Sequence, residues 1–154
     1  MDDYGRRVIL DLPFERTVGA TSKAFLAEGF DLVATLDIRD YLAHNAHHDC
    51  RRYLLLTALL PQLTLEALQH GPEIGAVLPT VIAIYELPDG ETAVAVSPAL
   101  APVMSDLGWR AARPALAALA DRAVERLARA LDRLQQTHCS NALPTAPVAE
   151  PMIG

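Results

Sequence analysis

Three of the five histidines of this chain lie in one polar segment, where their spacing could support metal binding. If residues 40–48 form a helix, Asp40, His44 and His48 lie four residues apart on one face, with His47 close by. Two imidazoles and a carboxylate suit Zn²⁺ or Fe²⁺, and a single imidazole suits an axial position on haem iron. The segment contains no HExxH motif, so a solvent-facing connection that happens to be rich in histidine is the alternative.

Nucleophilic and nucleotide-dependent chemistry find little support in the sequence. Cys50 follows a His-His-Asp triplet that could lower the pKa of its thiol, but side chains of adjacent residues rarely point together. Cys50 and Cys139 form no CxxC pair, which leaves either a disulfide or two free thiols. No serine lies in a GxSxG motif, and the chain has neither a GxGxxG motif nor a P-loop. Whether the protein is an enzyme is therefore open at this stage.

The composition indicates a folded domain with no affinity for nucleic acid. Apolar residues make up 51% of the 154 residues, which is enough for a core. The net charge is −6 and no basic block occurs, whereas nucleic-acid binding needs clustered lysine and arginine. No apolar run approaches the roughly 18 residues of a membrane helix, and the first residues lack the apolar centre of a signal peptide. We therefore expect a soluble, cytoplasmic protein without nucleic-acid or membrane partners.

A central β-hairpin is the first of the elements that would position these residues. Residues 77–87 are apolar at nearly every position, a Pro-Asp-Gly turn follows, and residues 92–96 form the second strand. Because the first run is apolar on both of its faces, we expect it to lie in the middle of a sheet. Further strands are predicted at residues 7–12, 30–37 and 53–59, and the last of these should also be interior because it lacks polar alternation.

Helices are predicted at residues 17–28 and 64–69 and, longest of all, at residues 109–136. The longest carries leucine and alanine at three- and four-residue steps, which gives one apolar stripe. Arginine and acidic residues on its other faces are spaced to form ion pairs along the helix, and an anion-binding patch is the alternative. Residues 139–154 are rich in proline and alanine without periodicity, which predicts a disordered tail after a single compact domain, residues 1–138.

These elements together predict an α/β protein of the α+β kind. We expect two layers: a mostly antiparallel sheet, and helices packed chiefly on one face of it, including the long C-terminal helix. The long apolar strand and the long apolar helix stripe exceed what one small sheet covers. Surplus apolar surface is typical of an interface, and two-fold dimers are the commonest assembly, so we expect a homodimer.

Several short motifs, in their order and spacing, resemble a known family. The matching positions fall near the ends of predicted strands and helices, and they are Leu12-Pro13-Phe14, Glu28-Gly29-Phe30, Asp37, Tyr53, Leu56, Pro61, Gly75, Leu78-Pro79 and Pro98. Over residues 8–134 the chain resembles the family known as domain of unknown function 302. The resemblance implies a small α/β domain, with at least one dimeric relative, and it implies no particular activity.

The chain departs from this family at two motifs. Family members carry Ala-Cys-Asn-Pro where residues 58–61 read Ala-Leu-Leu-Pro, and Leu-Pro-Cys-Asn where residues 78–81 read Leu-Pro-Thr-Val. Any thiol or metal chemistry of these motifs is therefore lost from this degenerate member. The resemblance also implies that the two motif strands are neighbours. Leu59, Leu60, Thr80 and Val81 would then lie near each other, and we expect them to line an apolar pocket of the kind that holds small molecules. A filled core is the alternative.

Three functions fit these observations. The first is a small homodimeric protein that holds a small apolar ligand or cofactor in a pocket between sheet and helices. The second is a protein, or an enzyme, that depends on haem or a divalent metal and uses His44, His47 and His48 as ligands. The third is an interaction module without a ligand. The first two would combine if the histidine segment covered the apolar pocket, as a flat hydrophobic cofactor would need.

Overall fold

A computed structural model describes residues 6–100 and 106–138 of the chain. The strands are β1 (Arg6–Leu10), β2 (Asp31–Asp37), β3 (Tyr53–Leu59), β4 (Thr80–Glu86) and β5 (Thr92–Ser97). The helices are α1 (Phe14–Ala27), α2 (Ile38–Asn45), α3 (Pro61–Leu68), the 3₁₀ helix η1 (Pro72–Val77), α5 (Leu107–Ala112) and α6 (Pro114–His138). The predicted tail, residues 139–154, and Cys139 with it, lie outside the described residues.

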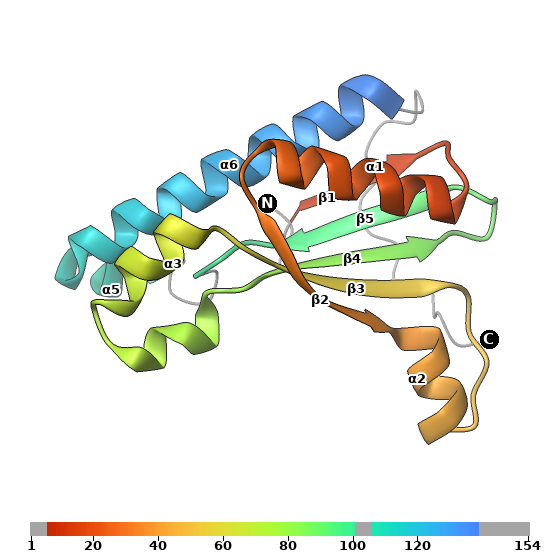
Figure 1. Cartoon of the computed structure of the whole chain (residues 1–154), viewed down its shortest axis with the longest axis horizontal. Coiled ribbons are helices and arrows are strands. Elements are labelled where there is room, and N and C mark those ends of the chain that lie inside the picture. Colours follow the sequence, from red (N-terminus) through yellow and green to blue (C-terminus); the bar gives the residue numbers. More distant parts are fainter. Residues whose placement is uncertain (1–5, 101–105, 139–154) are drawn as a thin grey trace.

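The five strands form one sheet in the order β1-β5-β4-β3-β2, and every neighbouring pair is antiparallel. β4 and β5 form the predicted hairpin, which a 2.8 Å hydrogen bond from the Leu87 N–H to the Glu91 carbonyl closes. Gly90 in its turn has a φ of 90°, a left-handed conformation that glycine adopts without strain. β4 is the central strand and β3 is interior, as their continuous apolar sequences predict. The α+β fold with an antiparallel sheet is thereby confirmed (Figure 1).

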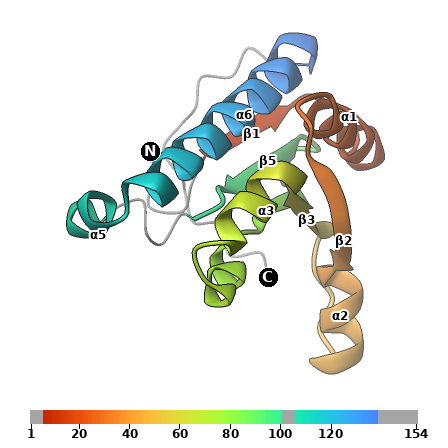
Figure 2. The same cartoon turned by 60° about the vertical axis from the view of Figure 1, so that its left-hand side comes forward.

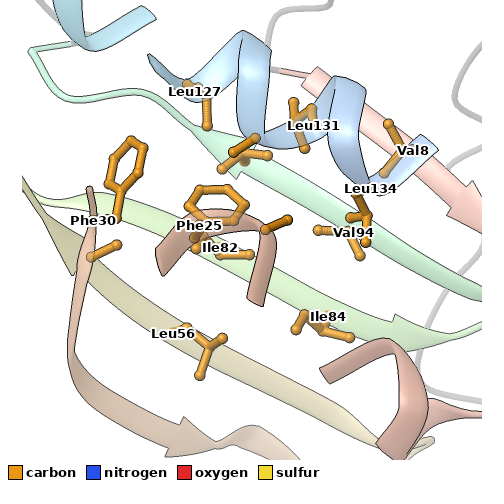
Figure 3. Packing of buried hydrophobic residues seen from close by; sticks show 14 of the residues in the cluster. Val8, Phe25, Phe30, Leu56, Ile82, Ile84, Val94, Leu127, Leu131 and Leu134 are labelled. Carbon is orange, nitrogen blue, oxygen red and sulfur yellow. The ribbon is translucent and has the colours of Figure 1, made fainter. Parts of the chain in front are cut away.

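Two helices, α1 and α6, lie side by side over one face of the sheet (Figures 1 and 2). Alternate strand residues point toward them, because successive side chains of a strand face opposite sides of the sheet. Ile82 and Ile84 of β4 are fully buried there, and so is Phe25 of α1, whose ring lies 5.1 Å from that of Phe30. Leu127, Leu131 and Leu134 of α6 complete this core (Figure 3). The predicted placement of helices on one face is therefore confirmed.

Proline fixes where two helices begin, three residues earlier than the sequence predicted. α1 begins at Phe14, and the Thr17 N–H donates to the Pro13 carbonyl at 3.0 Å, so Thr17 lies inside the helix rather than at its cap. α3 begins at Pro61 itself, because the fixed φ of proline suits the first turn and its missing N–H is not needed there.

The predicted helix over residues 109–136 is in fact two helices, α5 and α6. Proline disfavours helical geometry in the residue before it, and Arg113 accordingly adopts φ −132° and ψ 64°. The predicted strand at residues 77–87 is shorter as well, since η1 ends at Val77 and β4 begins at Thr80. Within residues 6–100 and 106–138, no helix combines the length and apolar character that crossing a bilayer requires.

The face of the sheet that α1 and α6 leave uncovered is also apolar, and we call it the open face. Strand alternation assigns to it Ile9, Leu36, Tyr53, Leu55, Val81, Ala83, Tyr85 and Ala95. Most of these side chains are half-buried, and Val81 is 37% exposed. Tyr53 and Tyr85 stack on this face with ring centroids 5.3 Å apart. Neither of the two apolar core clusters in the described chain includes these eight residues.

Candidate functional site

His44, the first of the predicted metal ligands, lies on the exposed surface of α2. The Asp37 carboxylate caps this helix by accepting the Asp40 N–H at 3.0 Å, and His44 lies one turn further along. Its Nδ1 is 2.8 Å from the Asp40 carbonyl oxygen. A carbonyl only accepts, so this hydrogen bond requires the proton on Nδ1 and leaves a lone pair on Nε2. That tautomer is the one in which Nε2 can bind a metal.

His47 and His48, the other two predicted ligands, form the exit of α2. His47 has a φ of 51°, the left-handed conformation that often ends a helix and that glycine or asparagine usually supplies. The backbone N–H of His48 then donates to the Leu42 carbonyl at 3.2 Å. The imidazole of His48 is half-buried, and its Nε2 is enclosed without a hydrogen-bond partner. The backbone of His47 therefore ends the helix in a conformation that does not require histidine, whereas the buried Nε2 of His48 lacks a hydrogen-bond partner among the described residues.

The helical arrangement that would bring the ligands together is only partly present. α2 ends at Asn45, so Asp40 and His44 share a helical face but His48 lies beyond it. The Asp40 carboxylate oxygen is 3.9 Å from His44 Nδ1, on a part of the helix that is open to solvent. In the described part of the chain, no three His, Cys, Asp or Glu side chains gather closely enough to hold a metal ion.

A second apolar cluster lies where α3, η1 and the first half of α6 meet, and we call it the end cluster. Its buried members are Leu63, Ala67, Ile74, Leu78, Ala99, Leu100, Leu116, Leu119, Ala120 and Ala123. Leu59 and Leu60, two of the predicted ligand-binding residues, pack against it and are half-buried, because β3 ends there and α3 begins. Val77 and Trp109 border the same cluster. The sequence analysis did not single out these two residues, although Trp109 is the one tryptophan of the chain.

Thr80 and Val81, the remaining predicted ligand-binding residues, point to opposite faces of the sheet. The register pairs Ala58 with Thr80 and Thr57 with Val81, so β3 and β4 are neighbours, as the family resemblance implied. Thr80 is buried on the face that the helices cover, whereas Val81 belongs to the open face. The structure thus brings Leu59 and Leu60 together at the end cluster, whereas Thr80 and Val81 do not share a face with each other.

The histidine segment and the end cluster lie at opposite ends of β3. The segment precedes Tyr53, where the strand begins, and the cluster adjoins Leu59, where it ends. A seven-residue strand spans roughly 20 Å. Figure 1 shows α2 and α3 at opposite ends of the sheet. The described structure therefore does not bring the histidines over the apolar residues, and a single site built from both is not present.

A buried carboxylate, Glu28, holds α1 and α6 together. Its side chain is 6% exposed and accepts hydrogen bonds from Arg129 Nε at 3.0 Å and Arg133 Nε at 2.5 Å. Arg126 donates to the backbone carbonyl of Glu28 at 3.1 Å. The two arginine hydrogen bonds, that of Arg133 foremost, hold the pKa of this carboxyl below its ordinary value.

The arginines of α6 thus have structural partners. Arg122 pairs with Glu66 of α3, and Asp121 pairs with Arg110 of α5. Among the ion pairs of the described residues, none joins two residues of α6, so the predicted pairing along the helix was wrong. The steps of three and four residues between Arg126, Arg129 and Arg133 place them on one face, and this spacing was a readable signal of a partner outside the helix.

The fold and the two candidate sites define a class of protein: a small antiparallel α+β domain with an apolar end cluster and a histidine segment at the exit of α2. Residues 6–134 match the model of the family described as Domain of unknown function DUF302, and the chain belongs to that family. No curated protein matches the chain.

One solved structure with the same fold is a crystal structure of an uncharacterized conserved DUF302 protein from Bacillus stearothermophilus. It superimposes with a TM-score of 0.70 and 21% sequence identity, over 86% of this chain and 98% of that chain. At this identity the likeness concerns the fold. It supports the arrangement of sheet and helices and carries no information on ligands.

Proposed function

We propose that this protein is a small homodimeric binding protein that holds a small apolar ligand between the sheet and the helices at the end cluster, beside Leu59 and Leu60. The observation that carries the proposal is that this cluster is distinct from the main core, which it adjoins at Leu60, and has an apolar rim of half-buried side chains, Leu59, Leu60, Val77 and Trp109. Apolar surroundings of this kind are the usual lining of small-molecule sites in proteins.

Further apolar side chains around the end cluster support the proposal. Leu65 and Leu68 of α3 are exposed, and Leu107 of α5 is 81% exposed. Single exposed leucines are common, and these three lie on the two helices that border the end cluster. The replacement of the family's cysteines and asparagines by leucine, threonine and valine makes the residues around Leu59 and Leu60 more apolar, in the direction that such a ligand requires.

The fluorescence of Trp109 tests this proposal directly, because it is the only tryptophan and it packs against the end cluster. Titration with decanoate, or with anilinonaphthalenesulfonate as an energy acceptor, should change its emission saturably. Leu60→Asn should weaken this response, because an amide without a partner is costly in an apolar wall. Leu26→Asn, at an exposed position on α1, is the matched control and should leave it unchanged. If neither probe gave a saturable response with the unmodified protein, the proposal would be overturned.

A second function, binding of haem or a divalent metal by the histidine segment, is favoured by one observation. His48 Nε2 is buried without a hydrogen-bond partner, and a bound metal would satisfy such a nitrogen. Hemin and Zn²⁺ titrations of the protein test it, with His48→Ala expected to lose binding. His70→Ala, an exposed histidine at the end of α3, is the control. Equal binding by both variants would exclude His48 as a ligand.

A further inference from the structure

The open face of the sheet, which ligand binding at the end cluster does not use, contains a residue that is completely buried. Ala93 of β5 is 0% exposed and belongs to neither of the two apolar core clusters. The register pairs Ala93 with Ile9 and Tyr85, so it lies between these two larger side chains on the open face. Among the described helices, α1 and α6 cover the opposite face, and α2 adjoins β2 and β3 (Figures 1 and 2). None of the described helices therefore lies over Ala93.

We propose that residues 139–154 of the same chain pack across the open face, from the β1 edge toward the stacked rings of Tyr53 and Tyr85. The inference goes beyond the proposed function and does not depend on it. A sheet face that meets water leaves even small side chains partly exposed between larger neighbours. A covering segment of the same chain accounts for the complete burial of Ala93.

The exposure of the other side chains on the open face indicates the path of this segment. Ile9, Tyr85 and Tyr53, which share the row of Ala93 near the hairpin turn, are half-buried. Leu36 on the β2 edge is 47% exposed, and Val81 at the far end of β4 is 37% exposed. The open face is thus least exposed along a path from the β1 edge, across β5 and β4, to the beginning of β3.

Of the three segments outside the described residues, residues 139–154 are the one that leaves the fold beside this path. Residues 1–5 and 101–105 adjoin the opposite end of the sheet, where β1 begins and beyond which β5 ends. The first half of α6 belongs to the end cluster, whereas Leu134 lies on the side of Ile84 and Val94 (Figure 3). α6 therefore runs toward the hairpin end, and it contacts the edge strand β1.

The length of the segment is sufficient for this path. Residues 139–154, at about 3.1 Å per residue in a polyproline conformation, span about 50 Å. Passing from the helix layer around the β1 edge to the open face takes about 20 Å, because packed layers lie about 10 Å apart. Crossing from β1 to β3 adds three strand spacings, about 15 Å. The segment therefore reaches the two tyrosines with several residues to spare.

The composition of residues 139–154 suits an apolar and aromatic surface. The segment contains three prolines, four large apolar side chains and a single charged side chain, Glu150. Proline-rich segments in polyproline conformation bind grooves lined by aromatic rings, and the stacked rings of Tyr53 and Tyr85 offer such a surface. This conformation needs neither helical nor strand periodicity, so the pattern that predicts a disordered tail is compatible with it. Attachment to the same chain also keeps the local concentration of the segment high.

Photochemical cross-linking of the full chain tests the contact directly. The photoreactive residue p-benzoylphenylalanine would replace Tyr85, and the irradiated protein would be digested with trypsin. Because no lysine or arginine follows Arg133, residues 134–154 are released as one peptide. We expect this peptide to be joined to position 85 through a residue after His138. The cross-linked protein should retain a single chain mass of 16.6 kDa under denaturing conditions.

Tyr41 supplies the matched control, because it is a tyrosine of α2 that is 52% exposed and lies away from the path. The same replacement at Tyr41 should give no cross-link to residues 139–154. If position 85 gave no cross-link to these residues in a protein with the circular dichroism of the parent, the inference would be overturned. A cross-link that joined two chains would overturn the cover by the same chain and assign the face to an interface between copies.

A second measurement leaves Tyr85 unchanged. Acetylation by N-acetylimidazole, located by mass spectrometry, reports the accessibility of each tyrosine hydroxyl. The double substitution Leu143→Asp and Val148→Asp should raise the acetylation rate of Tyr85 by about threefold or more, because carboxylates are costly to bury on an apolar surface. Tyr41 is the internal reference, and Ser140→Asp, which precedes the apolar residues, is the control variant that should change neither rate. An unchanged rate at Tyr85 in the double variant would contradict the inference.

Light scattering of the unmodified protein separates this inference from the proposed function. The proposed homodimer should give roughly twice the chain mass of 16.6 kDa. A single chain mass together with the cross-link from position 85 to residues 139–154 would overturn the homodimer and support the covered face. A double mass without that cross-link would support the homodimer and overturn the covered face.

Discussion

The carboxylate of Glu28 is the residue at which we expect the pH dependence of stability to be concentrated. Its pKa in the folded protein lies below the ordinary 4.5, so its ion pairs stabilise the fold above that pH and lose their effect as the pH falls through the folded-state pKa. In Glu28→Gln the charge is absent at every pH. We expect this variant to lose about 1–3 kcal/mol of unfolding free energy at neutral pH.

The difference between parent and variant is the measurement that isolates Glu28. Urea unfolding at a series of pH values should show the two unfolding free energies converging as the pH drops below 4.5. Other carboxylates titrate in both proteins, including Glu15, whose pKa Arg52 lowers, and their contribution cancels in the difference. A difference that stayed constant across the acid range would show that Arg129 and Arg133 do not depend on the charge of Glu28.

His47 and His44 should respond in opposite directions to the same substitution. His47→Gly relieves a left-handed conformation but makes the unfolded chain more flexible, and we expect a net gain of about 0.5 kcal/mol. His44→Gly places glycine inside α2 and should lower stability by about 0.5 kcal/mol. Urea midpoints measure both changes. A loss of stability on His47→Gly would indicate that its imidazole makes a stabilising contact.

At the scale of single elements, α6 is the helix on which the core depends most. Leu131 is 1% exposed and lies among the residues shown in Figure 3. Leu131→Ala should therefore cost about 2–5 kcal/mol, through lost burial and the cavity left behind. Leu26→Ala on α1, where the leucine is 55% exposed, should change stability by less than about 0.5 kcal/mol. Thermal and urea unfolding compare the two, and equal losses would contradict the assignment of Leu131 to the core.

The sequence predicted the helices and strands well where the apolar periodicity and the prolines indicated the same boundaries. It predicted them less well where a proline interrupted a continuing helical pattern. The hairpin of β4 and β5 and the apolar stripe of α6 follow from local patterns. The break at Pro114 was missed because residues that favour a helix stand on both sides of the proline. The partner of Arg129 could not be predicted for a different reason. Glu28 is about a hundred residues from Arg129 in sequence, and the packing of α1 on α6 brings the two together.

For the whole molecule, the sequence predicted the layers but not the relation between the two candidate sites. The histidines and Leu59 stand within twenty residues of each other, which suggested one combined site. The extended strand β3 lies between them and places them at opposite ends of the sheet, although they are close in sequence. The opposite facing of Thr80 and Val81 has the same origin, because adjacent strand residues never share a face.

The pairing of β1 with β5 has a consequence for the order in which this protein folds. Among the described residues, β1 is the first strand in the chain, yet it pairs with β5, the last, so the first and last strands join across more than eighty residues. The hairpin of β4 and β5 needs only a five-residue turn, and contacts between residues distant in sequence form slowly. During synthesis β1 therefore remains unpaired until β5 has left the ribosome.

The rates of folding and unfolding would register this delay. Val8→Ala in β1 should mainly accelerate unfolding, whereas Ile84→Val in β4 should mainly slow folding, as expected if the hairpin belongs to the transition state and β1 joins after it. Stopped-flow measurements in urea separate the two effects. The reverse pattern would mean that β1 pairs with β5 before the hairpin of β4 and β5 is complete.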